Sequence, residues 1–334
     1  MATKGFEIGG VTVPAGKTKR IDLEVSVLAN STQMNLPVHV INGAKPGPVF
    51  FMSAALHGDE IQGVEIIRRT LTGISAHTLG GTVLAVPIVN SFGFLNHSRY
   101  MPDRRDLNRS FPGSDRGSLA SLLADLFFTQ VVTRAKFGID FHTAALHRSN
   151  LPQIRIAPGD AELMKLAEAF SPPVILTAKL RDGSLRQTAG ERGVKVLLYE
   201  GGEALRFDEG AIDAAVKGTW RLLKHLGMIV EAPEMPPHAQ TVLANSSSWL
   251  RAPEGGILHT LRRAGDKVRE GEEVAVITGP LGEKPTPLLA DEDGIIIGRT
   301  HLPIVNRGDA LFHIARLKVK SKTAQIVPDE DEIV

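Results

Sequence analysis

Three side chains that could hold a metal ion follow two apolar stretches of this sequence. His57 and Glu60 come just after the apolar run PVFFMSAAL, and a turn or first helical turn places residues three apart on one side. This pair can chelate one cation, but a catalytic zinc needs a third ligand. His142, in the short apolar segment GIDFHT, is the best candidate. Two histidines and one glutamate form a set typical of catalytic zinc, which leaves the fourth position for water.

The same spacing has a simpler explanation, in which Glu60 caps a helix and the histidines are ordinary buried residues. A histidine with a glutamate three positions later is common by chance. Both parts of the motif, however, lie at the end of a predicted buried strand, and ligands bind at the carboxyl ends of strands in open α/β sheets. This position favours a metal site.

A metal-activated water also needs a base, and Glu200 is the candidate. It ends the apolar segment VKVLLYE, and a carboxylate that leaves a buried strand is costly to desolvate unless it is paired or used. The nearby Glu203 is instead expected as a charge before the long helix that follows. The pattern alone leaves open whether Glu200 is catalytic.

The segment 98–113 holds four arginines in a loop bounded by proline and glycine. Exposure to solvent explains some of these charges, because a charge run is usually a solvated face. Asn108 and Arg109 lie next to Phe111-Pro112-Gly113 and are more typical of a fixed anion clamp, since arginine offers a planar fork to a carboxylate. We therefore expect these two residues to bind a substrate carboxylate.

The elements that must position these residues alternate between strands and helices, which is the pattern of an α/β fold. An N-terminal hairpin is expected over 21–41, because two β-prone stretches flank an Asn-Ser-Thr turn. Strands are expected over 48–56, 81–89, 138–143, 153–158 and 194–200. Helices are expected over 61–71, near 117–136 and over 160–170, and a last helix of about 20 residues is expected to end near 228.

After residue 228 the pattern changes. Residues 228–240 contain three prolines and suit an interdomain connection, and no helical period follows over 248–316. In this region Gly256 and Gly294 are 38 residues apart, and Gly271 and Gly308 are 37 residues apart. Two segments therefore repeat at a nearly constant spacing, which indicates two copies of one small β unit. The predicted parts are a hairpin region over 1–45, a catalytic domain over 46–228, a linker over 229–241, a β domain over 242–318 and a tail over 319–334.

Composition narrows the classes of function. The chain has 38 basic and 37 acidic residues, and this balance argues against nucleic acid as a main partner. It has no cysteine, so disulfides and thiolate metal sites are excluded. No apolar run reaches the roughly 18 residues of a transmembrane helix, and the start lacks an apolar signal core. We expect a cytoplasmic protein with a small-molecule substrate and no membrane partner, and the β domain is a candidate contact surface for a homo-oligomer.

Four motifs in order across residues 57–203 closely resemble the succinylglutamate desuccinylase/aspartoacylase family, relatives of the zinc carboxypeptidases. They are HGDE, SRY followed by DLNRSFPG, DFHT and LLYEGGE. Within the family, the chain looks most like the bacterial branch with an added C-terminal β domain, which includes deacylases acting on N-acetyl-diaminobutyrate. The resemblance implies a zinc carboxypeptidase-like mixed sheet flanked by helices, with a smaller all-β, barrel-sandwich-like domain.

The resemblance also implies a role for each matched residue. One zinc per chain is expected, and the reaction is the removal of an acetyl or succinyl group from an N-acyl amino acid. A zinc carboxypeptidase that cleaves a C-terminal residue is the enzymatic alternative, and a non-catalytic metal-binding or partner-binding protein is the other. The carried-over roles are zinc ligands for His57, Glu60 and His142, general base and acid for Glu200, a cation beside the scissile carbonyl for Arg99, and a substrate-carboxylate clamp for Asn108 and Arg109.

The C-terminal repeat resembles the fold of biotinyl and lipoyl carrier domains. A carrier lysine stands on the turn between the two halves, flanked by methionine or hydrophobic residues. Here Lys284 lies between Glu283 and Pro285, so no carrier function is expected. The remaining histidines match no ligand position and are interpreted as structural or surface residues; examples are His97, His147, His225 and His301.

Overall fold

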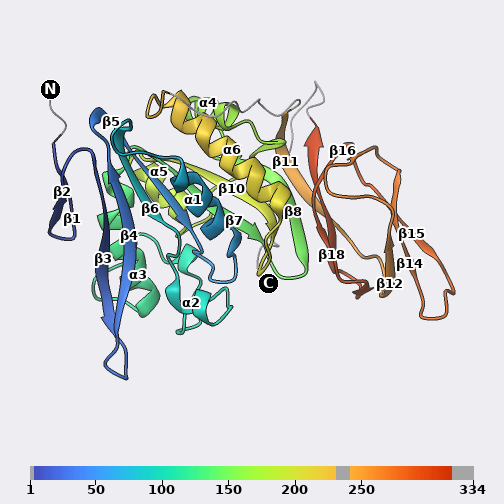
Figure 1. The fold of residues 1–334 in the computed structure, drawn as a ribbon. Helices are drawn as coiled ribbons and strands as arrows, with labels where there is room; N and C mark the ends of the chain where they lie inside the picture. The colour runs from blue at the N-terminus through green and yellow to red at the C-terminus, as the bar shows by residue number, and fades with distance from the viewer. Residues whose placement is uncertain (1–3, 231–240, 318–334) are drawn as a thin grey trace.

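The computed structural model describes residues 4–230 and 241–317. Twelve strands from both the N-terminal and the C-terminal regions form one mixed sheet that extends across the described structure (Figure 1). From edge to edge the strands are β3 (Lys17–Val27), β4 (Gln33–Asn42), β6 (Gly80–Val86), β5 (Lys45–Ala54), β7 (Phe137–Ala144), β10 (Lys195–Glu203), β8 (Arg148–Ile156), β9 (Val174–Thr177), β11 (Val242–Arg251), β18 (Ala310–Leu317), β16 (Gly294–Thr300) and β13 (Lys267–Val268).

Helices cover both faces of the central strands, which confirms the predicted α/β class. On one face, α1 (Gln62–Thr72), α4 (Ala161–Phe170) and α6 (Glu209–His225) enclose one hydrophobic core. On the other, α3 (Leu119–Gln130) and α5 (Leu185–Glu191) contribute to a second. Neighbouring residues of β5 serve opposite cores, Phe50 the first and Phe51 the second, because side chains alternate along a strand. Both faces of the sheet are therefore buried, as its apolar strands require.

Side-chain caps explain where several helices begin. Ser118 accepts a hydrogen bond from the backbone N–H of Ser121 at the start of α3. Asp160 and Asp208 cap α4 and α6 in the same way. Three short helices also occur within residues 4–230: α2 (Ser91–Leu95), η1 (Leu107–Arg109) and η2 (Val132–Arg134). A separate two-stranded sheet of β1 (Phe6–Ile8) and β2 (Val11–Val13) lies near the N-terminus.

The C-terminal strands confirm the predicted repeat. The first unit is β12 (Gly256–Thr260), β13 and β14 (Glu273–Thr278), and the second is β16, β17 (Ile304–Val305) and β18. The short strand of each unit pairs with the first strand of the other, β13 with β16 and β17 with β12, so the units interlock. A further strand, β15 (Thr286–Leu289), pairs with β14.

The C-terminal strands, from β11 onward, are joined by strand pairing to the part of the sheet formed by residues 4–230, which we call the catalytic half. β11 pairs in parallel with β9, and β16 pairs with β8. A small core of apolar side chains from β9, β11, β16 and β18 fills this junction. The proposed domain boundaries stay a prediction, and the sheet crosses them. Of the predicted linker only residues 229, 230 and 241 are described, and the tail over 319–334 lies outside the described residues.

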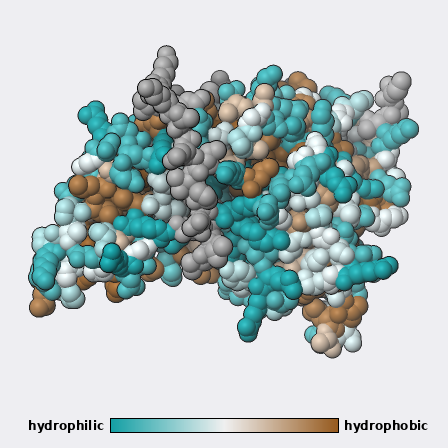
Figure 2. Space-filling view, turned by 180° about the vertical axis from the view of Figure 1, so that it is seen from behind, coloured by the Kyte–Doolittle hydropathy of each residue, from teal (hydrophilic) through white to brown (hydrophobic). Residues whose placement is uncertain are grey.

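The surface seen in Figure 2 is mixed, with its hydrophobic residues in small separate groups. The most exposed large apolar side chains include Leu281 and Ile304, both in the C-terminal region. Among the described residues, no helix combines the length and apolar character needed to cross a membrane.

Candidate active site

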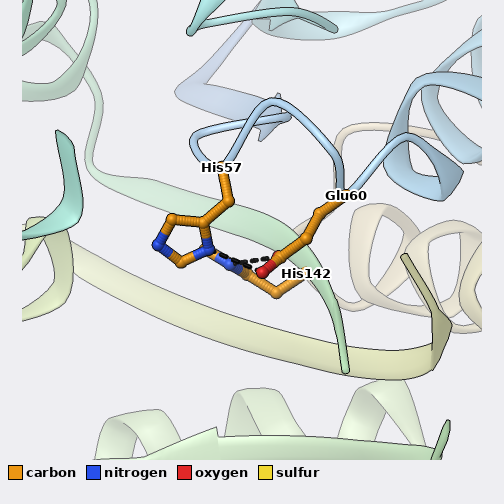
Figure 3. A group of neighbouring side chains, drawn as sticks. All are labelled: His57, Glu60 and His142. Carbon is orange, nitrogen blue, oxygen red and sulfur yellow. Dashed lines mark hydrogen bonds and ion pairs between the residues drawn. The ribbon is translucent and has the colours of Figure 1, made fainter. Parts of the chain in front are cut away.

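The three predicted metal ligands lie together at the carboxyl ends of two neighbouring parallel strands (Figure 3). His57 and Glu60 belong to the loop between β5 and α1, and His142 to β7. Nδ1 of His57 is 2.6 Å from Oε1 of Glu60, and Nδ1 of His142 is 2.7 Å from Oε2. One candidate ligand atom from each residue lies within 4.8 Å of the others, and all three residues are buried.

Close packing holds the loop that carries His57 and Glu60. A Cβ on Gly58 would lie 2.0 Å from the carbonyl carbon of Gly93, so a residue other than glycine at position 58 would require the backbone to move. The backbone N–H of Thr143, next to His142, donates to Oε2 of Glu60 at 3.1 Å. The loop and β7 are therefore tied to each other at the metal site.

Nε2 of each histidine, the ring nitrogen that faces away from Glu60, contacts a carboxylate. Nε2 of His142 is 2.7 Å from Oδ2 of Asp140, whose other oxygen accepts a hydrogen bond from Oγ of Ser53 at 2.7 Å. Nε2 of His57 is 3.2 Å from Oδ1 of Asp106. Histidines that bind metals commonly donate their second N–H to a carboxylate in this way, which fixes the ring and its tautomer. With both Nδ1 atoms facing Glu60, the residues present fit a divalent cation such as zinc.

Asp140 and Asp106 were not predicted as site residues, although the sequence holds a signal for each. Asp140 precedes His142 by two positions on a strand, so the two side chains share a face. Asp106 begins the DLNR motif, in which Asn108 and Arg109 are predicted site residues.

Buried charges within the cluster shift one another's protonation. Burial alone would raise the pKa of Glu60, but the rings of His57 and His142 hold that pKa well below its usual value. Burial alone would lower the pKa of His142, yet Asp140 and Glu60 raise it well above the usual value. The pKa of Asp106 is also lowered, by the His57 ring and against the effect of its own burial. Glu60 is therefore held ionised, the form that binds a cation.

Strand register brings Glu200 to the same place. β10 pairs in parallel with β7, and Glu200 stands directly beside His142, so both side chains project from the same face of the sheet. The register breaks just after Glu200, where Gly202 has a φ of +73°, a backbone conformation that favours glycine. Glu200 is 8% exposed, and Nδ2 of Asn150 donates to its Oε2 at 3.0 Å.

Glu203, the neighbouring acid, is used differently. Its Oε1 accepts a hydrogen bond from the backbone N–H of His147 at 3.0 Å, and its Oε2 is 3.5 Å from Nε of Arg206. Glu203 is not among the residues that line the active-site cavity, whereas Glu200 is. These contacts support Glu200 as the better placed base.

The arginine-containing segment 98–113 contacts the group of His57, Glu60 and His142 through Arg99. Its Nη2 is 3.0 Å from Oδ2 of Asp106, and its Nη1 is 3.4 Å from Oε1 of Glu60. Oδ1 of Asn108 accepts a hydrogen bond from the backbone N–H of Leu185 at 2.9 Å, which attaches the loop to α5, a helix that the sequence analysis did not anticipate. Nη1 of Arg109 donates to the backbone oxygen of Asn108 at 2.7 Å.

All seven predicted site residues line one cavity of about 330 Å³. This volume suits a small molecule. The cavity is also lined by side chains that were not predicted as site residues, and these come from the C-terminal strands β11 and β18. They are Asn245, Ser246, Ser247, Trp249, His313 and Arg316.

The chain is similar to known proteins over most of its length. Residues 46–226 match the family described as the succinylglutamate desuccinylase/aspartoacylase catalytic domain. The N-alpha-acetyl-L-2,4-diaminobutyric acid deacetylase of Halomonas elongata is 27% identical over 301 residues, covering 84% of this chain and 86% of that protein. The succinylglutamate desuccinylase of Pseudomonas aeruginosa is 24% identical over 237 residues, covering 64% of this chain and 69% of that protein.

Solved structures show the same fold over nearly the whole chain. A succinylglutamate desuccinylase/aspartoacylase from Rhodobacter sphaeroides superposes with a TM-score of 0.80 at 25% identity, covering 92% of this chain and 98% of that one. The ectoine utilization protein EutE (DoeB) from Ruegeria pomeroyi superposes with a TM-score of 0.79 at 23% identity, covering 91% and 97%. The predicted fold class, including the added β region, is confirmed.

Proposed function

This chain belongs to the succinylglutamate desuccinylase/aspartoacylase family, and we propose that it is a zinc-dependent amidohydrolase that deacylates an N-acyl amino acid. Its relatives are named for the removal of acetyl and succinyl groups from amino acids. One observation carries the proposal: Glu200 stands beside His142, in the cavity that also holds the other metal ligands. A protein that only stored a metal would need no carboxylate there.

His57, Glu60 and His142 would hold one zinc per chain, with Asp106 and Asp140 fixing the two rings. When bound, zinc supplies Lewis acidity, which brings the pKa of a water molecule toward about 7 and polarises the amide carbonyl. The reaction therefore depends on how the surrounding side chains orient the substrate and handle protons.

In this proposal Glu200 takes the proton from the attacking water and later returns it to the leaving nitrogen. Asn150 donates to Oε2 of Glu200 at 3.0 Å and thereby orients this carboxylate in the cavity. Arg99 contributes positive charge where the carbonyl oxygen becomes negative. Asn108 and Arg109 hold the α-carboxylate and thereby place the amide bond.

The test is an amine-release screen of the zinc-loaded protein against N-acetyl, N-succinyl and N-formyl amino acids, with short peptides as a parallel panel. We expect turnover of at least one N-acyl amino acid, loss of turnover after chelation and recovery on adding zinc. Release of C-terminal residues from peptides, with no reaction on acylated amino acids, would identify a carboxypeptidase instead.

A further inference from the structure

The backbone of β10 departs from regular pairing directly after Glu200, the proposed base. From Glu200 to Glu203 this strand advances three residues, while β7 beside it advances only two, from His142 to Ala144. β10 therefore contains a bulge, and Gly202 within it has a φ of +73°. A bulge re-aims the side chains next to it, so the direction of the Glu200 carboxylate depends on what holds the bulge.

One buried side chain, that of Gln62, contacts the bulge. Gln62 is the first residue of α1, two positions after the candidate metal ligand Glu60, and it is fully buried. Its Nε2 donates to the backbone oxygen of Gly201 at 2.8 Å, one residue after Glu200. A Cβ on Gly202 would lie 2.6 Å from Oε1 of Gln62, so the amide packs directly against the bulge.

The acceptor of the same amide is also engaged. Oε1 of Gln62 accepts a hydrogen bond from the backbone N–H of Asp208, the N-cap of α6, at 2.9 Å. The backbone N–H of Leu205 donates to the backbone oxygen of Asp59 at 2.8 Å, which is a second tie between the same two segments. Because the donor and the acceptor of the amide each have a backbone partner, the orientation of the Gln62 side chain is fixed.

The start of α1 is itself held against the strands that precede the metal ligands or carry them. A Cβ on Gly63 would lie 2.5 Å from the Cβ of Ala54 and 2.7 Å from the Cβ of Phe141. The helix therefore begins in direct contact with β5 and β7. Gln62 starts from a closely packed position and reaches across to β10.

We propose that Gln62 is a positioning residue, which fixes Glu200 relative to the metal ligands by holding the bulge that follows it. The inference rests on the proposed deacylase function, in which Glu200 transfers the proton. Gln62 is not among the residues that line the active-site cavity, so it acts on the substrate only through Glu200. A displacement of about 1 Å in a reacting group can lower a rate by about 10², so this contact affects the reaction more than binding.

Steady-state kinetics of Gln62→Met test this role. Methionine keeps the length of the side chain and removes both hydrogen bonds. In the zinc-loaded full chain, kcat should fall by at least about tenfold while KM changes by less than about threefold, because the base is misplaced and the substrate contacts remain. Zinc content should be unchanged, since Gln62 contacts none of the three ligand side chains in a printed bond to the metal centre: its partners are Gly201 and Asp208.

Asn42→Leu is the matched control, because Asn42 is another buried amide that joins separate segments. Its Nδ2 donates to the backbone oxygen of Val13 at 2.9 Å, and its Oδ1 accepts a hydrogen bond from Oγ1 of Thr82 at 2.9 Å. Both variants should have a lower melting temperature, but only Gln62→Met should have a lower kcat. Equal losses of kcat in the two variants would overturn the inference.

Combining Gln62→Met with Glu200→Gln separates positioning from a general structural effect. If Gln62 acts through the Glu200 carboxylate, the second substitution should lower the residual kcat of Glu200→Gln by less than about twofold. The same fold loss in both backgrounds would contradict the proposal. Zinc content and circular dichroism establish that each variant is folded, and Gln62→Asn, whose amide is one methylene shorter, is the second variant if Gln62→Met is not.

A crystal structure of the folded variant gives a readout that needs no substrate. The Glu200 carboxylate should be displaced relative to His142 by about 1 Å or more from its place in the wild type. An unchanged carboxylate would overturn the inference even if kcat falls. A displaced carboxylate in a protein whose wild type deacylates no N-acyl amino acid would retain the positioning role and contradict the proposed function instead.

Discussion

The two sides of the active-site cavity are built in different ways. The metal centre uses residues at the ends of adjacent parallel strands, β5 and β7, and each histidine there has a carboxylate partner. The other side is lined by residues of β8, β11 and β18. β8 follows β7 directly in the sequence, but β11 and β18 lie about a hundred residues or more beyond β7. In the proposed mechanism the reacting groups therefore come from local motifs within residues 46–228, while the C-terminal strands line other parts of the same cavity.

This difference has consequences for substitutions. In the metal centre each donor is buried and engaged by a neighbour, so removing one leaves an uncompensated polar group as well as an incomplete ligand set. Substitutions on the other side of the cavity leave this ligand set complete, so they should affect zinc binding much less.

The first prediction compares two histidines of one cavity. His142→Ala should lose the bound zinc and all measurable deacylation, because two ligands do not hold a catalytic zinc. His313→Ala, on the opposite side, should retain about one zinc per chain. Elemental analysis of both purified proteins measures this. Full zinc occupancy in His142→Ala would show that the ligand assignment is incorrect.

The second separates proton transfer from metal binding. Glu200→Gln preserves shape and removes the base, so kcat should fall by at least about 10² while zinc stays bound. Glu203→Gln is the control and should be close to wild type, since Glu203 contacts Arg206 and the backbone of His147 outside the cavity. A large loss in Glu203→Gln with a small one in Glu200→Gln would exchange their roles.

The third concerns the carboxylate behind His142. Asp140→Asn should weaken zinc affinity by about 10-fold to 100-fold, because the amide no longer accepts a charge-assisted hydrogen bond from the ring. Ser53→Ala removes only the hydroxyl that donates to Asp140 and should have a smaller effect. Competition with a chromophoric chelator measures both affinities, and unchanged affinity in Asp140→Asn would count against this role.

The fourth concerns the α-carboxylate clamp. Arg109→Lys keeps the charge but loses the planar fork, so kcat/KM should fall by roughly tenfold with zinc content unchanged. Wild type should discriminate strongly against a substrate whose α-carboxylate is replaced by a carboxamide, and the variant much less. If both proteins discriminate equally, the carboxylate is bound by another residue, and Arg104, Arg105, Arg186 and Arg192 are the next to test.

Much of the catalytic half could be predicted from local pattern. Continuous apolar runs such as 48–56 and 194–200 indicated buried strands, and β5 and β10 lie there. His57 follows the end of β5 as predicted, whereas β10 continues past Glu200 to Glu203. The short strand β9 and the helix α5 were not anticipated, because four to seven residues carry too little periodicity. Both matter to the site, since β9 joins the C-terminal strands to the sheet and α5 receives Asn108.

The sequence by itself indicated the candidate ligands, the alternation of strands and helices, and the C-terminal repeat, because each depends on neighbouring residues or on a regular spacing. Tertiary structure alone decided that Glu200 stands beside His142, since strand register joins residues 58 positions apart. It also decided that Trp249 and His313 line the same cavity as the metal ligands. Long-range strand pairing leaves no local pattern in the chain, and the composition of the substrate pocket follows from that pairing.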